Sequence, residues 1–335
     1  MVEWWGEHDG IKFPNVVMAQ QFSREQLERI FSLSAILKQS VYKGKMVEWL
    51  YGNIVLTLFY EPSTRTRLSH EVAALRLGAR VISSENAAEF SSAIKGETLE
   101  DTIRICSAMA DLIVIRHKET GSAKKAANVF KNSPIINGGD GKGQHPTQAL
   151  LDTFTIQEHF GHVDGLKVAM VGDLKRGRTV RSLSYMLSKF EGVKIFFVAP
   201  QVAQMNQDIK EHLTENNIPW EEMDNLIDVA RFADVVYMTR YQLERAESAE
   251  ERMALEAASK NHIMNKFVAN SMPEKSTIMH PLPRIEEIRW SVDQNLRARY
   301  FEEAENGIYV RMALLLAILN PQKAEELLVD KALVA

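Results

Sequence analysis

Residues 53–79, "NIVLTLFYEPSTRTRLSHEVAALRLGA", contain the pattern that decides the fold class. The first eight residues, "NIVLTLFY", are apolar and β-branched, which predicts a buried strand. Leu68, Val72 and Leu75 then follow at four- and three-residue steps, and the pattern stops at Gly78, which predicts a helix with one apolar face. The segment "EPSTRTR" therefore lies on a turn from strand to helix, where open α/β sheets bind their ligands.

Strand-like and helix-like segments alternate along the rest of the chain. The predicted strands are 79–84, 111–117, 133–137, 166–173, 193–200, 233–240 and 276–283. The predicted helices are 22–39, 96–110, 122–130, 145–161, 179–190, 203–213, 249–259, 306–320 and 323–334. Alternation of this kind predicts an α/β fold with mainly parallel sheets flanked by helices on both faces.

The length of 335 residues suits two domains of ordinary size. The long helix that begins at His145 and ends near Phe160, followed by "GHVDG", is interpreted as the junction between them. We therefore expect two doubly wound domains, with the first ending at residue 160 and the second beginning at residue 161.

Composition excludes several classes of protein. The formal net charge of −4 argues against a general nucleic-acid binder, and Cys106 is the single cysteine, so one chain has no disulfide framework. The N-terminus lacks the pattern of a signal peptide, and the longest apolar run, "MALLLAIL", is too short to cross a bilayer. We expect a soluble, cytoplasmic protein with neither nucleic acid nor membrane as partner.

The segment "EPSTRTR" combines several donors at a helix start. Ser63 is a suitable N-cap, and free N–H groups at a helix N-terminus attract anions. Arg65 and Arg67 add positive charge, and Ser63, Thr64 and Thr66 add hydroxyl groups. These features predict a phosphate-binding site, although a capped helix with two solvated arginines is the simpler alternative.

Two further arginines come at strand ends. Arg116 is predicted just past the buried, apolar part of the strand 111–117, and Arg240 ends another strand, with Gln242 two residues later. An arginine in this position of an α/β sheet points to the ligand crevice. A surface ion pair is the alternative for each, and for Arg240 its partner would be Glu244.

Three loops add candidate residues. A glycine-rich stretch leads into His145 and Gln148, which share a first helical turn and could both donate to a carbonyl oxygen. Gly172 to Thr179 falls one residue short of a Walker A motif and has Arg178 in place of its lysine, so the turn favours a small anion such as a carboxylate. "HPLPR" is a proline-stiffened loop in which Leu282 offers a backbone carbonyl.

No metal-binding spacing and no G-x-S-x-G elbow is present in the sequence. We therefore expect neither a metal nor another cofactor. A dinucleotide-binding oxidoreductase is also disfavoured, because the G-x-G-x-x-G spacing is missing.

Taken together, "STRTR", "HPTQ", "GDLKRGRTV", "YMTRYQ" and "HPLPR", in this order, resemble the motifs of the aspartate/ornithine carbamoyltransferase family. They span residues 63–284, and "NGIYVRMALLLAIL" is similar to the C-terminal helix with which the family returns to its first domain. The forms "HPLPR" and "GDLKRGRTV" resemble the aspartate branch, because ornithine enzymes have a cysteine in the corresponding "HCLP" motif.

The resemblance implies a carbamoyl-phosphate domain of residues 1–160, to which 308–335 return, and an aspartate domain of residues 161–307. Carried over by position, the residues that bind carbamoyl phosphate are Ser63, Thr64, Arg65, Thr66, Arg116, His145, Gln148, Leu282 and Pro283. Those that bind aspartate are Ser91, Lys95, Arg178, Arg240 and Gln242. The catalytic set is Arg65, Thr66, Lys95, Arg116 and His145, with Ser91 and Lys95 donated by a neighbouring subunit of a homotrimer.

The implied reaction is transfer of the carbamoyl group of carbamoyl phosphate to the α-amine of L-aspartate, an early step of de novo pyrimidine (UMP) biosynthesis. Regulatory chains or a dihydroorotase as further partners are left open. Two alternatives also remain: a carbamoyltransferase for ornithine or an acylated ornithine, and an inactive scaffold subunit. The first would require acidic residues near Arg178 and Arg240, and the second would be expected to lose donors from "STRTR" or "HPTQ", which are intact. Departures from the family pattern, such as His70 in place of a common Phe, do not touch these positions.

Overall fold

The structure is a computed structural model, and it describes residues 7–8, 11–12, 15–44, 47–87, 96–129 and 133–334. The chain forms two compact units, one of residues 1–151 and 305–335 and the other of residues 152–304. The helices α6 (Pro146–Phe160) and α12 (Tyr300–Leu319) each begin in one unit and end in the other.

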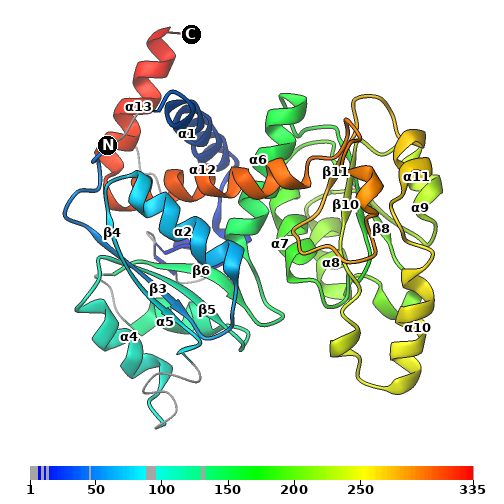
Figure 1. The fold of residues 1–335 in the computed structure, drawn as a ribbon, viewed down its shortest axis with the longest axis horizontal. Helices are drawn as coiled ribbons and strands as arrows, with labels where there is room; N and C mark the ends of the chain where they lie inside the picture. Colours follow the sequence, from blue (N-terminus) through cyan, green and yellow to red (C-terminus); the bar gives the residue numbers. More distant parts are fainter. Residues whose placement is uncertain are drawn as a thin grey trace. The chain divides into compact units, whose positions relative to one another are not determined.

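The first unit contains a parallel four-stranded sheet (Figure 1). In sheet order its strands are β4 (Arg80–Glu85), β3 (Ile54–Phe59), β5 (Leu112–His117) and β6 (Ile135–Asp140). A short antiparallel pair, β1 (Glu7–His8) and β2 (Ile11–Lys12), precedes it. The expected strands at residues 53–60, 79–84, 111–117 and 133–137 are thus confirmed.

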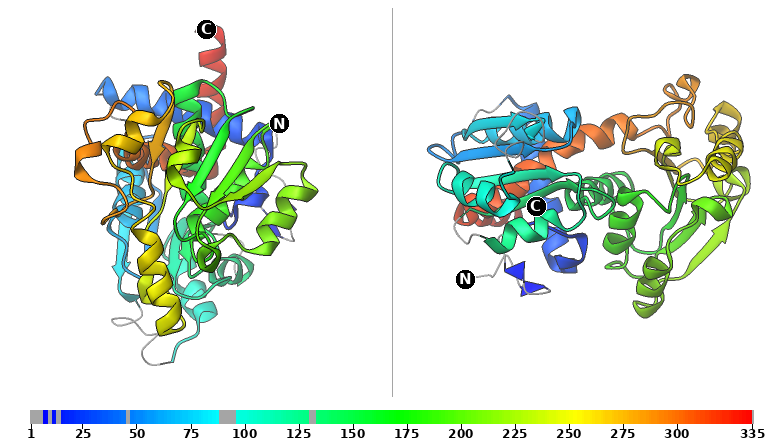
Figure 2. Two further views of the ribbon diagram at one scale, coloured as in Figure 1. Left: turned by 90° about the vertical axis from the view of Figure 1, so that its right-hand side faces the viewer. Right: turned by 90° about the horizontal axis from the view of Figure 1, so that it is seen from below.

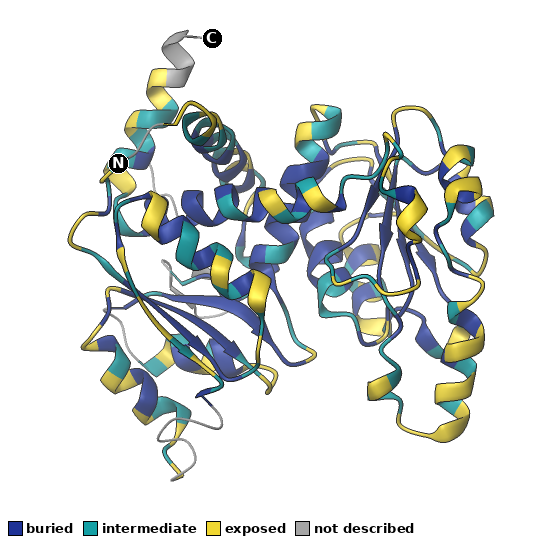
Figure 3. Cartoon of the chain, in the orientation of Figure 1, coloured by how far each residue is buried: buried dark blue, intermediate teal, exposed yellow. Residues whose placement is uncertain are grey.

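Helices lie on both faces of this sheet. They are α1 (Arg24–Tyr42), α2 (Thr64–Arg76), α4 (Leu99–Ser107), α5 (Ser122–Val129) and the unit's parts of α6 and α12, while α13 (Pro321–Val334) packs against α1. On one face, Ile103 of α4 and Ala123 of α5 belong to a buried cluster with Leu56 and Ile113 of the strands. Strands β3, β5 and β6 are buried along most of their length (Figure 3), whereas the edge strand β4 has no buried residue.

The prediction that Leu68, Val72 and Leu75 form the buried face of α2 is wrong. Leu68 and Leu75 are 44% and 59% exposed, whereas the buried side chains are Thr66, His70, Ala73 and Ala74. Small alanines allow a helix to lie close to its neighbours, so packing selects that face over the one with the larger leucines. Large apolar side chains are consequently left on the surface of this chain.

The second unit contains a parallel five-stranded sheet. In sheet order its strands are β11 (Thr277–Met279), β10 (Val235–Met238), β7 (Lys167–Val171), β8 (Lys194–Val198) and β9 (Trp220–Met223). Its further helices are α7 (Arg178–Leu187), α8 (Gln207–Glu215), α9 (Leu226–Ala230), α10 (Ala249–Ser259) and α11 (Lys266–Ser271). Short 3₁₀ turns occur at Ala19–Gln21, Gln201–Ala203, Leu243–Arg245 and Trp290–Val292.

The helices of this unit cover both faces of its sheet (Figures 1 and 2). Connections from β7 to β8 to β9 run in one direction across the sheet, and those from β9 to β10 to β11 run in the other. Because such crossovers are right-handed, α7 and α8 lie on one face and α9 and α11 on the opposite face. The predicted doubly wound arrangement is therefore confirmed.

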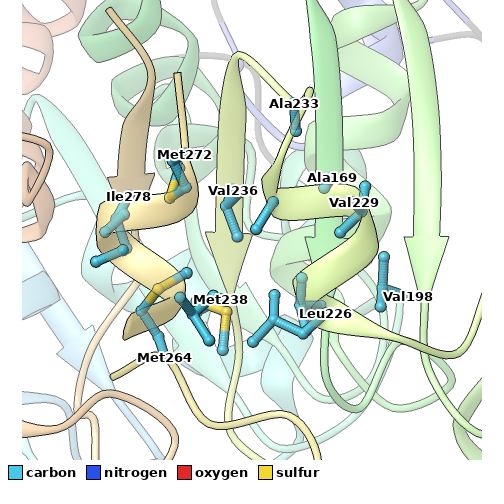
Figure 4. Close-up of a cluster of buried hydrophobic side chains, with 14 of the residues drawn as sticks. Ala169, Val198, Leu226, Val229, Ala233, Val236, Met238, Met264, Met272 and Ile278 are labelled. Carbon is cyan, nitrogen blue, oxygen red and sulfur yellow. The ribbon is translucent and has the colours of Figure 1, made fainter. Parts of the chain in front are cut away.

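Figure 4 shows the core beneath α9 and α11, where Leu226 and Val229 of α9 pack with Val236 and Met238 of β10. The sequence analysis missed β9, α9 and α11. The strand β9 has the sequence "WEEM" and no fully buried residue, so it lacks the apolar run by which the other strands were found. The helix α9 has five residues and α11 has six, which is too short for a clear helical period.

A buried acidic pair lies in the second unit, formed by Asp152 of α6 and Glu303 of α12, which are 0% and 1% exposed. The hydroxyl of Tyr237 donates to Asp152 Oδ2 at 2.8 Å, and the backbone N–H of His280 donates to Glu303 Oε2 at 2.7 Å. Burial and the charge of Asp152 raise the pKa of Glu303 well above its usual range. The folded chain therefore retains a proton on Glu303 that the unfolded chain releases near the usual carboxyl pKa.

The raised pKa of Glu303 predicts a dependence of stability on pH. A carboxyl group whose pKa is higher in the folded state than in the unfolded state stabilises the fold. This stabilisation is fully present at pH values below the unfolded-state pKa and is lost as pH rises through the folded-state pKa. Because Glu303→Gln places a neutral group there at every pH, its melting temperature should fall less than that of the parent chain between about pH 5 and about pH 9. The measurement is thermal unfolding across this range, with the partly exposed Glu302→Gln as control. Parallel curves for the parent chain and Glu303→Gln would contradict the prediction.

Candidate functional site

Each sheet has one point at which the direction of its connections reverses. In the first unit it lies between β3 and β5, and in the second between β7 and β10. Ligands of open α/β sheets bind outside the carboxyl ends of the strands at this point. The two segments that the sequence analysis singled out, 61–67 and 172–179, come directly after β3 and β7 and lead into α2 and α7. The topology therefore supports one binding region in each unit.

In the first unit, Ser63 is the N-cap of α2, but its side chain makes no capping hydrogen bond. The hydroxyl and the first N–H groups of α2 are thus available to a ligand, and the positive end of the helix dipole favours an anion.

The two arginines of "STRTR" differ in their partners. Arg67 Nη2 lies 2.9 Å from Glu85, and its Nη1 lies 3.2 Å from Glu71. Arg65 is exposed, and none of the described acidic residues forms an ion pair with it. Arg65 is therefore the better candidate for binding an anion, and Arg67 has a structural role.

Thr66 and His145 are brought together from α2 and the start of α6. Thr66 Oγ1 lies 3.3 Å from His145 Nε2, and the two residues are 7% and 4% exposed. Gly138 of β6 lies beside them, since a Cβ at this glycine would be 3.4 Å from Thr66 Cγ2. Gln148 is in the first turn of α6, where its N–H donates to the carbonyl of His145. The predicted pair His145 and Gln148 thus opens a helix as expected.

Arg116 lies within β5, inside the predicted strand 111–117, and it belongs to the buried part of that strand, so the prediction that it lies past the buried part is wrong. The strand is longer than its apolar run because the backbone of Arg116 still pairs with that of Phe59. The guanidinium is buried, donates to the Gly138 carbonyl at 3.1 Å and lies 3.0 Å from Glu61 Oε2. Since Gly138 also lies next to Thr66, this cation is close to the Thr66–His145 pair.

In the second unit, Arg178 is the first residue of α7 and Arg240 lies two residues past β10. Arg240 Nη1 donates to Glu244 Oε2 at 3.1 Å, so the predicted alternative of an ion pair with Glu244 is present. The backbone N–H of Gln242 donates to Asp173 Oδ2 at 3.2 Å, which joins the loop after β10 to the loop after β7. Asp173 therefore joins the segment that leads into Arg178 at the start of α7 to the loop that contains Arg240.

Sequence analysis missed the charged residues that shape these loops. Asp173 is fully buried, and Arg176 Nη1 lies 3.3 Å from its Oδ1. Burial raises the pKa of Asp173, while Arg176 and two backbone N–H groups act in the opposite direction. Glu61, the partner of Arg116, was missed as well. The only signal in the sequence was a charged residue directly after a buried strand.

The loop after β11 contains Leu282 and Pro283. Leu282 has φ of +51°, which is the left-handed region, and its side chain packs against the core of the unit. Its backbone is therefore held in a fixed and unusual conformation.

Ser91 and Lys95 lie outside the described residues. Within the part of the chain that the structure describes, no group of three or more His, Cys, Asp and Glu residues could hold a metal ion. None of the helices described there has the length and apolar character needed to span a membrane.

Two family models match this chain. Residues 15–158 match the carbamoyl-phosphate-binding domain of aspartate/ornithine carbamoyltransferases, and residues 164–318 match their aspartate/ornithine-binding domain.

Relatives match over nearly the whole chain. A chloroplastic aspartate carbamoyltransferase of Arabidopsis thaliana is 52% identical over 91% of this chain and 77% of that protein. The catalytic subunit of aspartate carbamoyltransferase from Aliivibrio fischeri is 42% identical over 91% of this chain and 96% of that protein. Among solved structures, aspartate transcarbamoylase from Trypanosoma cruzi in complex with carbamoyl phosphate and aspartate has a TM-score of 0.86 at 36% identity, covering 92% of this chain and 97% of that one.

The fold, its two binding regions and these matches together define a two-domain α/β transferase. The chain belongs to the aspartate/ornithine carbamoyltransferase family, and within it to the aspartate carbamoyltransferases. The family that the motifs resembled in the sequence is therefore confirmed.

Proposed function

We propose that this chain transfers the carbamoyl group of carbamoyl phosphate to the α-amine of L-aspartate, giving N-carbamoyl-L-aspartate and phosphate, as a step of pyrimidine biosynthesis. The observation that supports it most is the grouping of Thr66, Arg116 and His145 at the switch point of the first unit. Solved relatives contain carbamoyl phosphate with aspartate, or carbamoyl aspartate with phosphate. Both pairs belong to the two sides of this reaction.

The phosphate of carbamoyl phosphate binds at the start of α2. Ser63 and Thr64 supply hydroxyl groups, the first N–H groups of the helix point to the anion, and Arg65 neutralises its charge. Arg116, which like Thr66 lies next to Gly138, contacts both the phosphate and the carbamoyl group.

The carbonyl carbon becomes tetrahedral when the amine attacks, and negative charge develops on its oxygen. Thr66, Arg116 and His145 are the donors to this oxygen, which requires that His145 present an N–H there. Donors fixed before the reaction stabilise such an oxyanion, and removal of one typically costs about 2.7–4 kcal/mol. Gln148 and the backbone of Leu282 and Pro283 bind the amide end of the carbamoyl group.

L-Aspartate offers two carboxylates, and Arg178 and Arg240 bind them together with Gln242 and, from a neighbouring subunit, Ser91 and Lys95. Arg240 is partly neutralised by Glu244, so a bound carboxylate competes with that side chain. Ornithine is disfavoured because its side-chain ammonium would lie among these arginines. The phosphate leaving group takes the proton released by the amine.

The active assembly is a homotrimer whose sites are shared between subunits, in a cytoplasmic compartment. A surface of large apolar side chains supports association with further copies: Leu68 and Leu75 of α2 and Ile82 of β4, an edge strand, are all exposed. Exposed apolar groups that lie together on one unit are typical of subunit contacts.

Replacing Arg65 by Ala tests the phosphate site. We expect kcat/KM for carbamoyl phosphate to fall by at least about a hundredfold, because the cation that neutralises the phosphate is removed. The control is Arg76→Ala, an exposed arginine in the last turn of the same helix. The measurement is a steady-state assay of both variants, and sedimentation shows whether their assembly is unchanged. Full activity of Arg65→Ala would refute the assignment of Arg65 to the phosphate.

Mixing two inactive variants tests the shared site. An assembly that contains both Arg65→Ala and Lys95→Ala chains has some sites with an intact Arg65 from one chain and an intact Lys95 from its neighbour. Activity should therefore reappear when the two variants are dissociated, mixed and reassembled, whereas each variant reassembled alone stays inactive. A mixture without activity, at the trimer mass by sedimentation, would mean that each site is built from a single chain.

A further inference from the structure

A single buried imidazole organises the loop that follows β11. His280 is 2% exposed. The backbone N–H of Leu282 donates to His280 Nδ1 at 2.7 Å, and His280 Nε2 lies 2.8 Å from Glu287 Oε1. The side chain thus bridges the residue two positions later and a carboxylate seven positions later.

These contacts fix the tautomer of His280. A backbone N–H can only donate, so Nδ1 must be the unprotonated nitrogen that accepts. The remaining proton of a neutral imidazole is then on Nε2, from which it donates to the carboxylate of Glu287. Burial alone would raise the pKa of Glu287, but the hydrogen bond from His280 and the backbone N–H groups outweigh burial and lower it. Glu287 therefore remains a charged acceptor.

Further contacts extend this network along the loop. Glu287 Oε2 accepts the backbone N–H groups of Ile285 at 3.2 Å and Glu286 at 3.1 Å. The backbone N–H of His280 itself donates to Glu303. The N–H groups of residues 280, 282, 285 and 286 are thus all bound by three side chains of the same unit, those of His280, Glu287 and Glu303.

Leu282 is the residue at which this network has the largest effect. Its φ of +51° lies in the left-handed region, which costs free energy for a residue with a Cβ. The hydrogen bond from its N–H to His280 holds it in that conformation, and the same conformation sets the direction of its carbonyl. Among the described residues no donor is bound to that carbonyl.

We propose that His280, as the Nε2–H tautomer held by Glu287, is a positioning residue that fixes the backbone of Leu282 for binding of the carbamoyl amide. This proposal rests on the proposed function, in which the Leu282 carbonyl accepts a hydrogen bond from the carbamoyl NH₂ group. His280 acts through the loop and does not itself touch the substrate.

Two substitutions of His280 separate its two contacts. The Oδ1 of Asn occupies nearly the place of Nδ1, so His280→Asn retains the acceptor for Leu282 and loses the bond to Glu287. The amide of Gln reaches the place of Nε2, so His280→Gln retains the donor to Glu287 and loses the acceptor for Leu282. We expect His280→Gln to lower kcat/KM for carbamoyl phosphate about tenfold more than His280→Asn, the effect of one hydrogen bond of ordinary strength.

Binding measurements make this test independent of turnover. Phosphonoacetamide has the phosphonate and the amide of the substrate, and inorganic phosphate has no amide. By calorimetry, His280→Gln should bind phosphonoacetamide about tenfold more weakly than His280→Asn and bind phosphate equally well. His212→Gln, on α8 and hydrogen-bonded to Ser188, is the control and should behave like the parent chain in both titrations.

Substitution of Glu287 provides a second test if either His280 variant does not fold. In Glu287→Gln, the amide oxygen accepts the N–H groups of Ile285 and Glu286, so the amide NH₂ group faces His280. Because this NH₂ group donates, it favours the tautomer of His280 in which Nε2 is unprotonated. That tautomer places a proton on Nδ1 against the N–H of Leu282, so the same selective loss of phosphonoacetamide binding is expected. Equal weakening of phosphate and phosphonoacetamide, or no weakening in His280→Gln and Glu287→Gln, would overturn the proposal. A parent chain that binds phosphonoacetamide but forms no carbamoyl product would instead contradict the proposed function.

Discussion

The buried guanidinium of Arg116 is the charge on which the first binding region depends. A cation removed from water must be paired, and here Glu61 and the Gly138 carbonyl provide that pairing. The same contacts hold the guanidinium beside Thr66, which in turn lies against His145. The donors of the proposed oxyanion site are therefore in place before any ligand arrives, which is the condition under which such donors are effective.

Arg240 in the second unit follows the same principle. Its carboxylate partner, Glu244, balances its charge while the arginine lies near the surface. When a dicarboxylate binds, one of its carboxylates replaces that of Glu244 beside Arg240. The charge of Arg240 is therefore balanced both with and without the ligand. Arg65 differs, because it is exposed and needs no internal partner. The sites thus combine exposed cations that attract anions with buried cations that orient them.

Much of the fold could be predicted because its signals are local. Apolar runs such as that of β3 and the turn "EPSTRTR" are visible without any knowledge of the tertiary structure. The exposed face of α2 could not be predicted, because the choice between its alanines and its leucines depends on what packs against the helix. Likewise, β9 could not be predicted because it has no apolar run. Asp173 was missed because its role depends on a tertiary contact, the hydrogen bond from the backbone N–H of Gln242. Thr66 and His145, which the motifs assigned to one ligand, lie next to each other in the structure, whereas the residues that orient them were not predicted.

The most direct test of the central claim is an assay for ureido product with the purified chain, carbamoyl phosphate, and either L-aspartate or L-ornithine as acceptor. Product with L-aspartate alone is the predicted result, since Arg178 and Arg240 present cations to the acceptor. Product with L-ornithine in place of L-aspartate would contradict the assignment of the second unit. Absence of product with both acceptors, from a chain that is folded and assembled, would contradict the proposed reaction itself.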